Sequence, residues 1–248
     1  MLASLGAKGE TVITNAAREP EIKDLADFLI KCGAKISGAG QSVIRIEGSF
    51  SADNIEHTVI PDRIVASTYM AAAACAGGRI AIRNIIKDHL VPVVHTFEIA
   101  GCEMKFGENE LVIEAPERLH RVRYIRTMPY PGFPTDSQAA VMAMLTKARG
   151  TSVINENIFE NRFRHVPELI KMGADIRVEN NSVAVIEGSD ALKSARVTAC
   201  DLRGGCALAV AALGAEGKTI INGIHHIDRG CQSIEDDLTQ LGAEIKRV

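Results

Sequence analysis

One aspartate and three arginines stand where acid–base or anion-binding chemistry is favoured. Asp136 follows residues 128–134 (MPYPGFP), in which three prolines fix backbone φ angles and lower the entropy lost on folding. A carboxylate held this firmly beside an apolar helix suits a general base. Arg162, Arg203 and Arg229 recur in equivalent loops, and guanidinium groups bind carboxylates or phosphates in bidentate geometry. If these loops converge, the sequence predicts an anion site with one base.

Plainer interpretations of the same residues stay open at this point. Asp62, Asp136 and Asp201 each precede or begin an apolar run, where an aspartate caps free helix N–H groups. Arg203 and Arg229 lie next to acidic residues and can instead form local ion pairs, with Asp201 and Asp228 respectively.

Other motifs are weaker. Residues 38–40 (GAG) lack the third glycine of a dinucleotide-binding loop and predict a hairpin turn. His225 and His226 are adjacent and are predicted to point apart on a strand, which disfavours a shared metal ion.

A repeated unit is expected to position the candidate residues. Four similar stretches begin at Gly9, Gly77, Arg149 and Glu216, roughly 70 residues apart. Each opens with a short β-rich run, continues with an amphipathic helix and closes that helix with a glycine. An alternating strand follows, at residues 34–36 in the first stretch and 243–245 in the last, and then a hairpin in all but the last.

Ala-rich helices are predicted between these stretches. They cover residues 64–76, 137–148 and 204–215 and are nearly free of charge on every side. A helix that is apolar all round is buried. We therefore predict an α/β fold with an inside-out, barrel-like arrangement, in which packed helices lie inside and sheets lie outside.

Composition narrows the classes of function. The chain has 248 residues, of which 46% are hydrophobic and 24% charged, and its net charge is −3. This balance gives no bulk attraction to nucleic acid or to an anionic membrane. The first residues lack the pattern of a signal peptide, and the six cysteines show no zinc-ligand spacing. We expect a cytoplasmic protein with reduced thiols.

The two ends of the chain fall inside the repeat. Residues 1–8 match only the tail of a buried helix, and the last stretch stops at Val248, before a second hairpin strand. An unpaired sheet edge is unusual in a self-contained domain. The repeat therefore predicts that the sequence is a piece of a longer protein.

Several motifs together resemble the UDP-N-acetylglucosamine 1-carboxyvinyltransferases, a branch of the enolpyruvyl transferases. The similarity runs along essentially the whole chain. The motifs are NAAREPEI (15–22), GAGQSVIRIEG (38–48), PDR (61–63), PYPGFPTDSQA (129–139), FENRFRHVPEL (159–169), GAD (173–175), DLR (201–203) and HIDRG (226–230).

The resemblance implies a fold of two inside-out α/β domains, each built of three similar units, with the active site between them. Residues 1–60 would then be the end of the first domain and residues 61–248 the second. In this family the second domain also takes in the N-terminal segment of the protein, which would supply the strand missing after Val248.

The resemblance also implies a reaction and its residues. The family transfers the enolpyruvyl group of phosphoenolpyruvate to the 3-hydroxyl of UDP-N-acetylglucosamine and releases phosphate, without a metal or organic cofactor. Asp136 matches the aspartate that contacts the 3-hydroxyl and acts as general base. Ile158 matches a position whose backbone contacts the UDP-sugar. Arg203 and Arg229 match arginines that serve phosphoenolpyruvate and domain closure, and Arg162 matches one near the same interface.

Departures from the family keep alternatives open. The mobile loop with the catalytic cysteine, the Lys-Asn pair for phosphoenolpyruvate and most of the uridine site would lie upstream of Met1. Cys231 stands where an aromatic residue is usual, and Cys200 where threonine is common. We therefore expect this chain alone not to turn over, and to need the N-terminal part or a complementary chain. A shikimate 3-phosphate enzyme of the same superfamily and a non-catalytic remnant or binding module remain the rival hypotheses.

Overall fold

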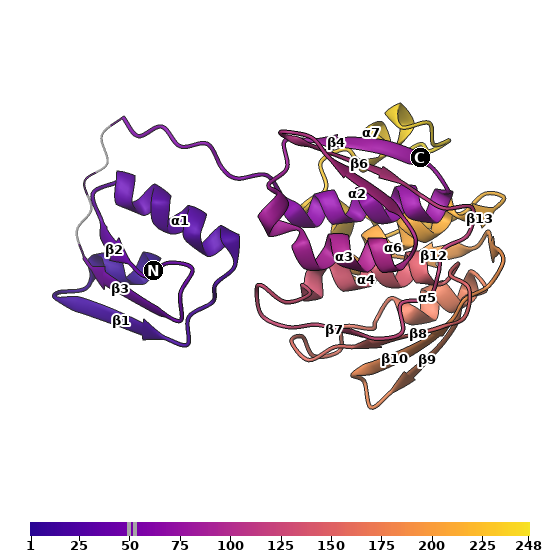
Figure 1. The fold of residues 1–248 in the computed structure, drawn as a ribbon, viewed down its shortest axis with the longest axis horizontal. Helices are drawn as coiled ribbons and strands as arrows, with labels where there is room; N and C mark the ends of the chain where they lie inside the picture. Colours follow the sequence, from indigo (N-terminus) through magenta and orange to yellow (C-terminus); the bar gives the residue numbers. More distant parts are fainter. Residues whose placement is uncertain (49–50, 52–53) are drawn as a thin grey trace. The chain divides into compact units, whose positions relative to one another are not determined.

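The computed structural model describes residues 1–48, 51 and 54–248 (Figure 1). The chain divides into two compact units. The first comprises Met1–Pro61 with Pro129–Gly132, and the second comprises Asp62–Met128 with Phe133–Val248.

The first unit packs one helix on a small antiparallel sheet. Its elements are η1 (Leu2–Gly6), β1 (Glu10–Thr14), α1 (Pro20–Lys31), β2 (Lys35–Ser37) and β3 (Val43–Glu47). The strand order is β1-β3-β2, and the turn predicted at residues 38–40 joins β2 to β3. Helix α1 buries Ala26 and Leu29, while Ile44 and Ile46 line the inner face of β3. The alternation along β3 follows from the two-residue period of a strand.

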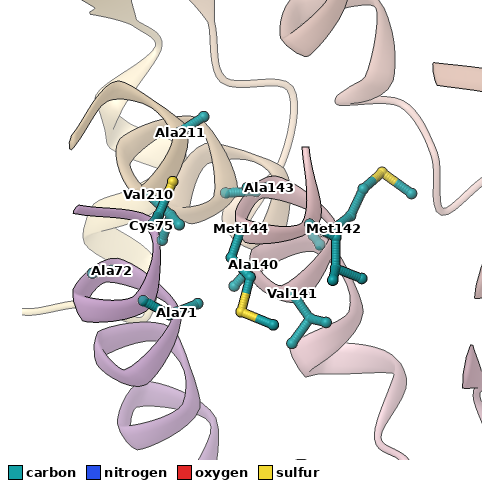
Figure 2. Packing of buried hydrophobic residues seen from close by; sticks show 14 of the residues in the cluster. Ala71, Ala72, Cys75, Ala140, Val141, Met142, Ala143, Met144, Val210 and Ala211 are labelled. Atoms are coloured by element: carbon teal, nitrogen blue, oxygen red, sulfur yellow. The ribbon is translucent and has the colours of Figure 1, made fainter. Parts of the chain in front are cut away.

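Three buried helices form the centre of the second unit. They are α2 (Arg63–Ala76), α4 (Thr135–Leu145) and α6 (Leu202–Leu213), and each contacts the other two. Small side chains such as Ala71 and Ala143 lie between the helices, with Met144 among the larger ones (Figure 2). Burying this apolar surface is the main favourable term in folding. The prediction of buried Ala-rich helices is confirmed.

Sheets cover the helices of the second unit. One face of each sheet packs on the helices and the other faces solvent. The larger ones have the strand orders β4-β6-β5 and β7-β8-β10-β9, and two parallel pairs are β11-β13 and β12-β14. Exposed residues alternate with less exposed ones, as along β4 and β9. The bounds are β4 (Arg79–Arg83), β5 (Glu103–Phe106), β6 (Glu110–Glu114), β7 (Ile125–Arg126), β8 (Thr151–Asn155), β9 (Asp175–Glu179), β10 (Val183–Glu187), β11 (Leu192–Lys193), β12 (Arg196–Thr198), β13 (Ala215–Glu216) and β14 (Ile220–Asn222).

Shorter helices complete the second unit. They are η2 (Lys87–His89), α3 (Val91–Ile99), α5 (Val166–Lys171), η3 (Ile224–Arg229) and α7 (Ile234–Gln240). The glycines predicted to end the amphipathic helices all have positive φ angles, from 87° to 100°, at Gly33, Gly101, Gly173 and Gly242. A side chain is strained in this conformation, and glycine is not.

Two local predictions were wrong. Residues 243–245 form no strand, because no described strand lies beside them to pair with their backbone. His225 and His226 lie in the 3-10 helix η3 rather than on a strand, and their ring centroids are 4.2 Å apart. The left-handed backbone of Gly223 (φ 73°) ends β14 and begins this turn.

Candidate functional site

The aspartates at the starts of the three buried helices have different roles. Asp62 accepts hydrogen bonds from the N–H groups of Ile64 (2.8 Å) and Val65 (2.9 Å), and so caps α2. Asp201 likewise accepts from the N–H of Gly204 (2.7 Å) and caps α6. Asp136 lies within the first turn of α4, beyond the N-cap position, and caps no N–H group in the described chain. The capping interpretation therefore holds for Asp62 and Asp201 and fails for Asp136.

Asp136 instead binds two arginines. Arg162 donates through Nη2 to Oδ1 at 2.5 Å, and Arg203 donates through Nη2 to Oδ2 at 3.1 Å. Arg162 also donates to the carbonyl oxygen of Thr135 at 3.3 Å. The arginine side chains are only 10% and 19% exposed, whereas that of Asp136 is 42% exposed. The result is a carboxylate that is fixed on both oxygens but still open to solvent.

The charge of this carboxylate is strongly favoured. Burial alone would raise the pKa of Asp136, but the charges and hydrogen bonds of Arg203 and Arg162 outweigh it, so the pKa lies below its usual value. The positive end of the α4 dipole acts in the same direction. Asp136 is therefore ionised at neutral pH.

The local ion pairs considered from the sequence do not form. Arg203 pairs with Asp136 rather than with Asp201. Asp228 pairs with Arg247, at 2.7 and 3.0 Å, rather than with its neighbour Arg229. Arg229 is exposed and has no ion-pair partner among the residues that the structure describes.

Close packing at two glycines holds the segment of Arg229 against α6, which carries Arg203. A Cβ atom added at Gly205 would lie 2.6 Å from Cγ1 of Ile227, and one at Gly230 would lie 2.7 Å from Cδ2 of Leu202. Two glycines thus let η3 and the chain after it approach α6. The convergence of Arg229 on Asp136 itself stays a prediction.

Glu156 organises the loop after β8 and was missed by the sequence analysis. It is 4% exposed. Its Oε1 accepts from Thr127 Oγ1 (2.8 Å) and from the N–H groups of Ile158 (2.9 Å) and Phe159 (3.0 Å), while Oε2 accepts from Thr135 Oγ1 (2.9 Å). One buried carboxylate thus joins the end of β7, the start of α4 and the loop. The signal was present, since Ser152, Ile154 and Glu156 share the inner face of an alternating strand.

Ile158 presents its backbone beside this carboxylate. Its side chain is 45% exposed and its N–H is taken by Glu156. A ligand contact through the backbone of Ile158 therefore falls to its carbonyl oxygen.

A hollow lies next to Arg162. It has a volume of about 650 Å³ and is lined by Phe159, Glu160, Asn161, Arg162, Arg164 and Asp201. The guanidinium of Arg162 also stacks on the ring of Phe159, 4.8 Å from its centroid. Two arginines line the hollow together with the acidic residues Glu160 and Asp201, so its charged side chains are balanced in sign.

Within residues 1–48, 51 and 54–248, no three His, Cys, Asp or Glu side chains come together as a metal site. No helix in this part is long and apolar enough to cross a bilayer.

Comparison with known proteins identifies the family. The model of the family described as EPSP synthase (3-phosphoshikimate 1-carboxyvinyltransferase) matches residues 1–238. The chain belongs to this family. The enolpyruvyl transferase NikO from Streptomyces tendae has a similar structure, with a TM-score of 0.86 and 26% identity over 99% of this chain and 58% of that one. EPSP synthase from Acinetobacter baumannii, at 18% identity and a TM-score of 0.73 over 99% of this chain and 60% of that one, shares the fold.

Curated relatives of this chain also support the branch that the motifs indicated. UDP-N-acetylglucosamine 1-carboxyvinyltransferase 2 of Caldanaerobacter subterraneus subsp. tengcongensis is 50% identical over 248 residues. UDP-N-acetylglucosamine 1-carboxyvinyltransferase of Geobacter metallireducens is also 50% identical over 248 residues. Both matches cover all of this chain and 59% of the relative, so the chain spans well under two thirds of their length. The resemblance to this branch is confirmed.

Proposed function

We propose that this chain takes part in transferring the enolpyruvyl group of phosphoenolpyruvate to the 3-hydroxyl of UDP-N-acetylglucosamine, with release of phosphate. The relatives at about 50% identity carry the name of this activity. The observation that carries the proposal is the solvent-accessible carboxylate of Asp136, fixed by two guanidinium groups at the start of a buried helix.

Asp136 is the general base of the proposed reaction. A carboxylate has about four lone-pair positions, so Asp136 can still accept a hydroxyl group while it binds Arg162 and Arg203. It takes the proton of the 3-hydroxyl as the hydroxyl oxygen bonds to C2 of phosphoenolpyruvate. A proton added at C3 completes a tetrahedral adduct, and loss of a C3 proton and of phosphate gives the enol ether.

Cations and one backbone group bind the substrates. Arg203 and Arg229 serve phosphoenolpyruvate and closure of the site, and Arg162 lies near the same anion. Cations that are already positioned stabilise developing negative charge at low reorganisation cost. The carbonyl of Ile158, held by the Glu156 loop, contacts the UDP-sugar. No metal or organic cofactor takes part.

The remainder of the site belongs to the part of the relatives that this chain does not match. An N-terminal segment or a complementary chain would supply the mobile loop and the other phosphoenolpyruvate ligands. We place the reaction in the cytoplasm, in the synthesis of peptidoglycan precursors.

Transfer to shikimate 3-phosphate is the second candidate, because the description of the matching family model names that acceptor. Identity argues for the UDP-sugar, at 50% against 18% for the Acinetobacter EPSP synthase. A non-catalytic binding module is the third candidate.

A chimaera separates the three candidates. The 248-residue chain replaces the matching 59% of the Caldanaerobacter transferase 2. We expect phosphate release from phosphoenolpyruvate with UDP-N-acetylglucosamine and none with shikimate 3-phosphate. Release with shikimate 3-phosphate alone would favour the second candidate. A folded chimaera that binds UDP-N-acetylglucosamine without phosphate release would favour the third.

A further inference from the structure

Two buried thiols lie side by side, outside the residues assigned to substrates. The sulfur atoms of Cys206 and Cys231 are 3.4 Å apart, and the residues are 2% and 5% exposed. The remaining cysteines, which form no such pair in the described chain, are Cys32, Cys75, Cys102 and Cys200.

The pair spans a contact that is already tightly packed. Cys206 lies on α6, and Cys231 follows η3 and Gly230. Gly205 and Gly230, where the two elements approach closely, each directly precede one of the two cysteines. A disulfide bond has a length of about 2.05 Å, so the sulfurs need to move together by about 1.4 Å in total.

The pKa values of the two thiols shift in opposite directions. The hydrogen bond between the two thiols lowers the pKa of Cys231 against the effect of burial, and the charge of Arg203 acts in the same direction. Asp62 and Asp237 oppose this weakly. The same hydrogen bond, together with burial, raises the pKa of Cys206. Cys231 is the better thiolate, and thiolates rather than thiols attack disulfides.

We propose that Cys206 and Cys231 form a redox-active dithiol, which a low-molecular-weight disulfide such as glutathione disulfide converts to an intramolecular disulfide. The Cys231 thiolate attacks one sulfur of the oxidant and expels one thiolate. Cys206 then loses its proton and attacks the Cys231 sulfur, which expels the second. The protein loses two hydrogen atoms, and the oxidant is reduced to two thiols.

Cys200 provides an internal comparison, because it is more exposed than either member of the pair. Burial raises the pKa of Cys200, and the carboxylate of Asp201, with Sγ to Oδ2 at 3.6 Å, acts in the same direction. If solvent exposure decides which cysteine a disulfide oxidant attacks, Cys200 reacts first. If the proximity of two thiols decides it, Cys206 and Cys231 react first.

The consequence for catalysis rests on the proposed function. Arg229 precedes Cys231 by two residues and Arg203 precedes Cys206 by three. The disulfide would tie the Arg229 segment covalently to α6, and so restrict the movement of Arg229 during closure.

The test is intact-mass analysis of the purified 248-residue chain after equilibration with mixtures of glutathione and glutathione disulfide, quenched with N-ethylmaleimide. We expect the loss of two hydrogens and a peptide that joins Cys206 to Cys231, formed about tenfold faster than any adduct on Cys200. Cys206→Ser and Cys231→Ser should each abolish the joined peptide. The control Cys200→Ser should behave as the parent.

Two results would overturn the proposal. One is complete alkylation of Cys206 and Cys231 by N-ethylmaleimide when the chain is taken from the most oxidising mixture, unfolded and then labelled. The other is a glutathione adduct on Cys200 that accumulates before the pair reacts. Because the readout is mass, either result leaves the proposed transferase activity untouched.

Discussion

Asp136 differs from Asp62 and Asp201 by its place in the first turn of its helix. The two capping aspartates use their oxygens on helix N–H groups, whereas Asp136 uses both oxygens on arginines. A capping carboxylate is already satisfied by its own helix. Among the three, only Asp136 joins separate segments of the chain, and this makes it the candidate base.

His165 gives a pH dependence of stability. It is 1% exposed, and burial, helped by the charge of Arg162, lowers its pKa from 6.5 to about 4 although Asp201 opposes the change. Between these values the unfolded chain binds a proton that the folded chain does not, so stability is complete above pH 6.5 and falls as the pH drops towards 4. Urea unfolding should show a loss of about 2 kcal/mol between pH 7.5 and pH 5. In His165→Gln this slope should disappear; an unchanged slope would contradict the assignment.

Glu156 should tolerate glutamine but not alanine. Glutamine can keep an acceptor oxygen at the Oε1 position and donate from the other side to Thr135 Oγ1. Alanine leaves the N–H groups of Ile158 and Phe159 without their acceptor. We expect unfolding free energy to fall by about 3 kcal/mol in Glu156→Ala and by about 1 kcal/mol in Glu156→Gln. Equal losses in denaturant titrations would show that the hydrogen bonds are not the cause.

At the scale of elements, the periodicity of the sequence predicted the helices and hairpins but not the contacts between them. The Ala-rich runs identified α2, α4 and α6, and alternating residues identified the hairpins. The partner of Arg203 was not predictable, because Arg203 meets an aspartate 67 residues away. That meeting depends on how α4 and α6 pack. The strand expected at residues 243–245 is absent, because a strand needs a neighbouring strand to pair with and no described strand pairs with these residues.

The contact between α6 and η3 depends on Gly205. A Cβ atom there would meet Ile227 Cγ1 at 2.6 Å and Ala199 Cβ at 3.0 Å. We expect Gly205→Ala to lower the free energy of unfolding by about 1–3 kcal/mol through overpacking. The matched control is Gly78→Ala, where the nearest atom is 4.0 Å away. Equal midpoints of denaturant unfolding for both variants would mean that α6 and η3 are not tightly packed.

At the scale of the whole molecule, a repeated unit brings side chains from distant parts of the sequence to one place. Asp136, Arg162 and Arg203 come from α4, the loop after β8 and the start of α6. The sequence predicted the repeat and the candidate residues, and the structure confirms contact between Asp136 and both arginines. The division into domains at residue 60 stays a prediction, and so do the roles of the site residues, Asp136, Ile158, Arg162, Arg203 and Arg229. They involve ligands or segments beyond the second unit.

The most direct measurement is the turnover number of Asp136→Asn in the chimaera with the Caldanaerobacter transferase 2. Asparagine keeps the shape of the side chain but takes up no proton, so we expect kcat to fall by about 10²–10⁴-fold while UDP-N-acetylglucosamine still binds. Asp62→Asn, which alters a helix cap, should keep the kcat of the parent. An Asp136→Asn chimaera that releases phosphate at the parental rate would contradict the assignment of Asp136 as the base.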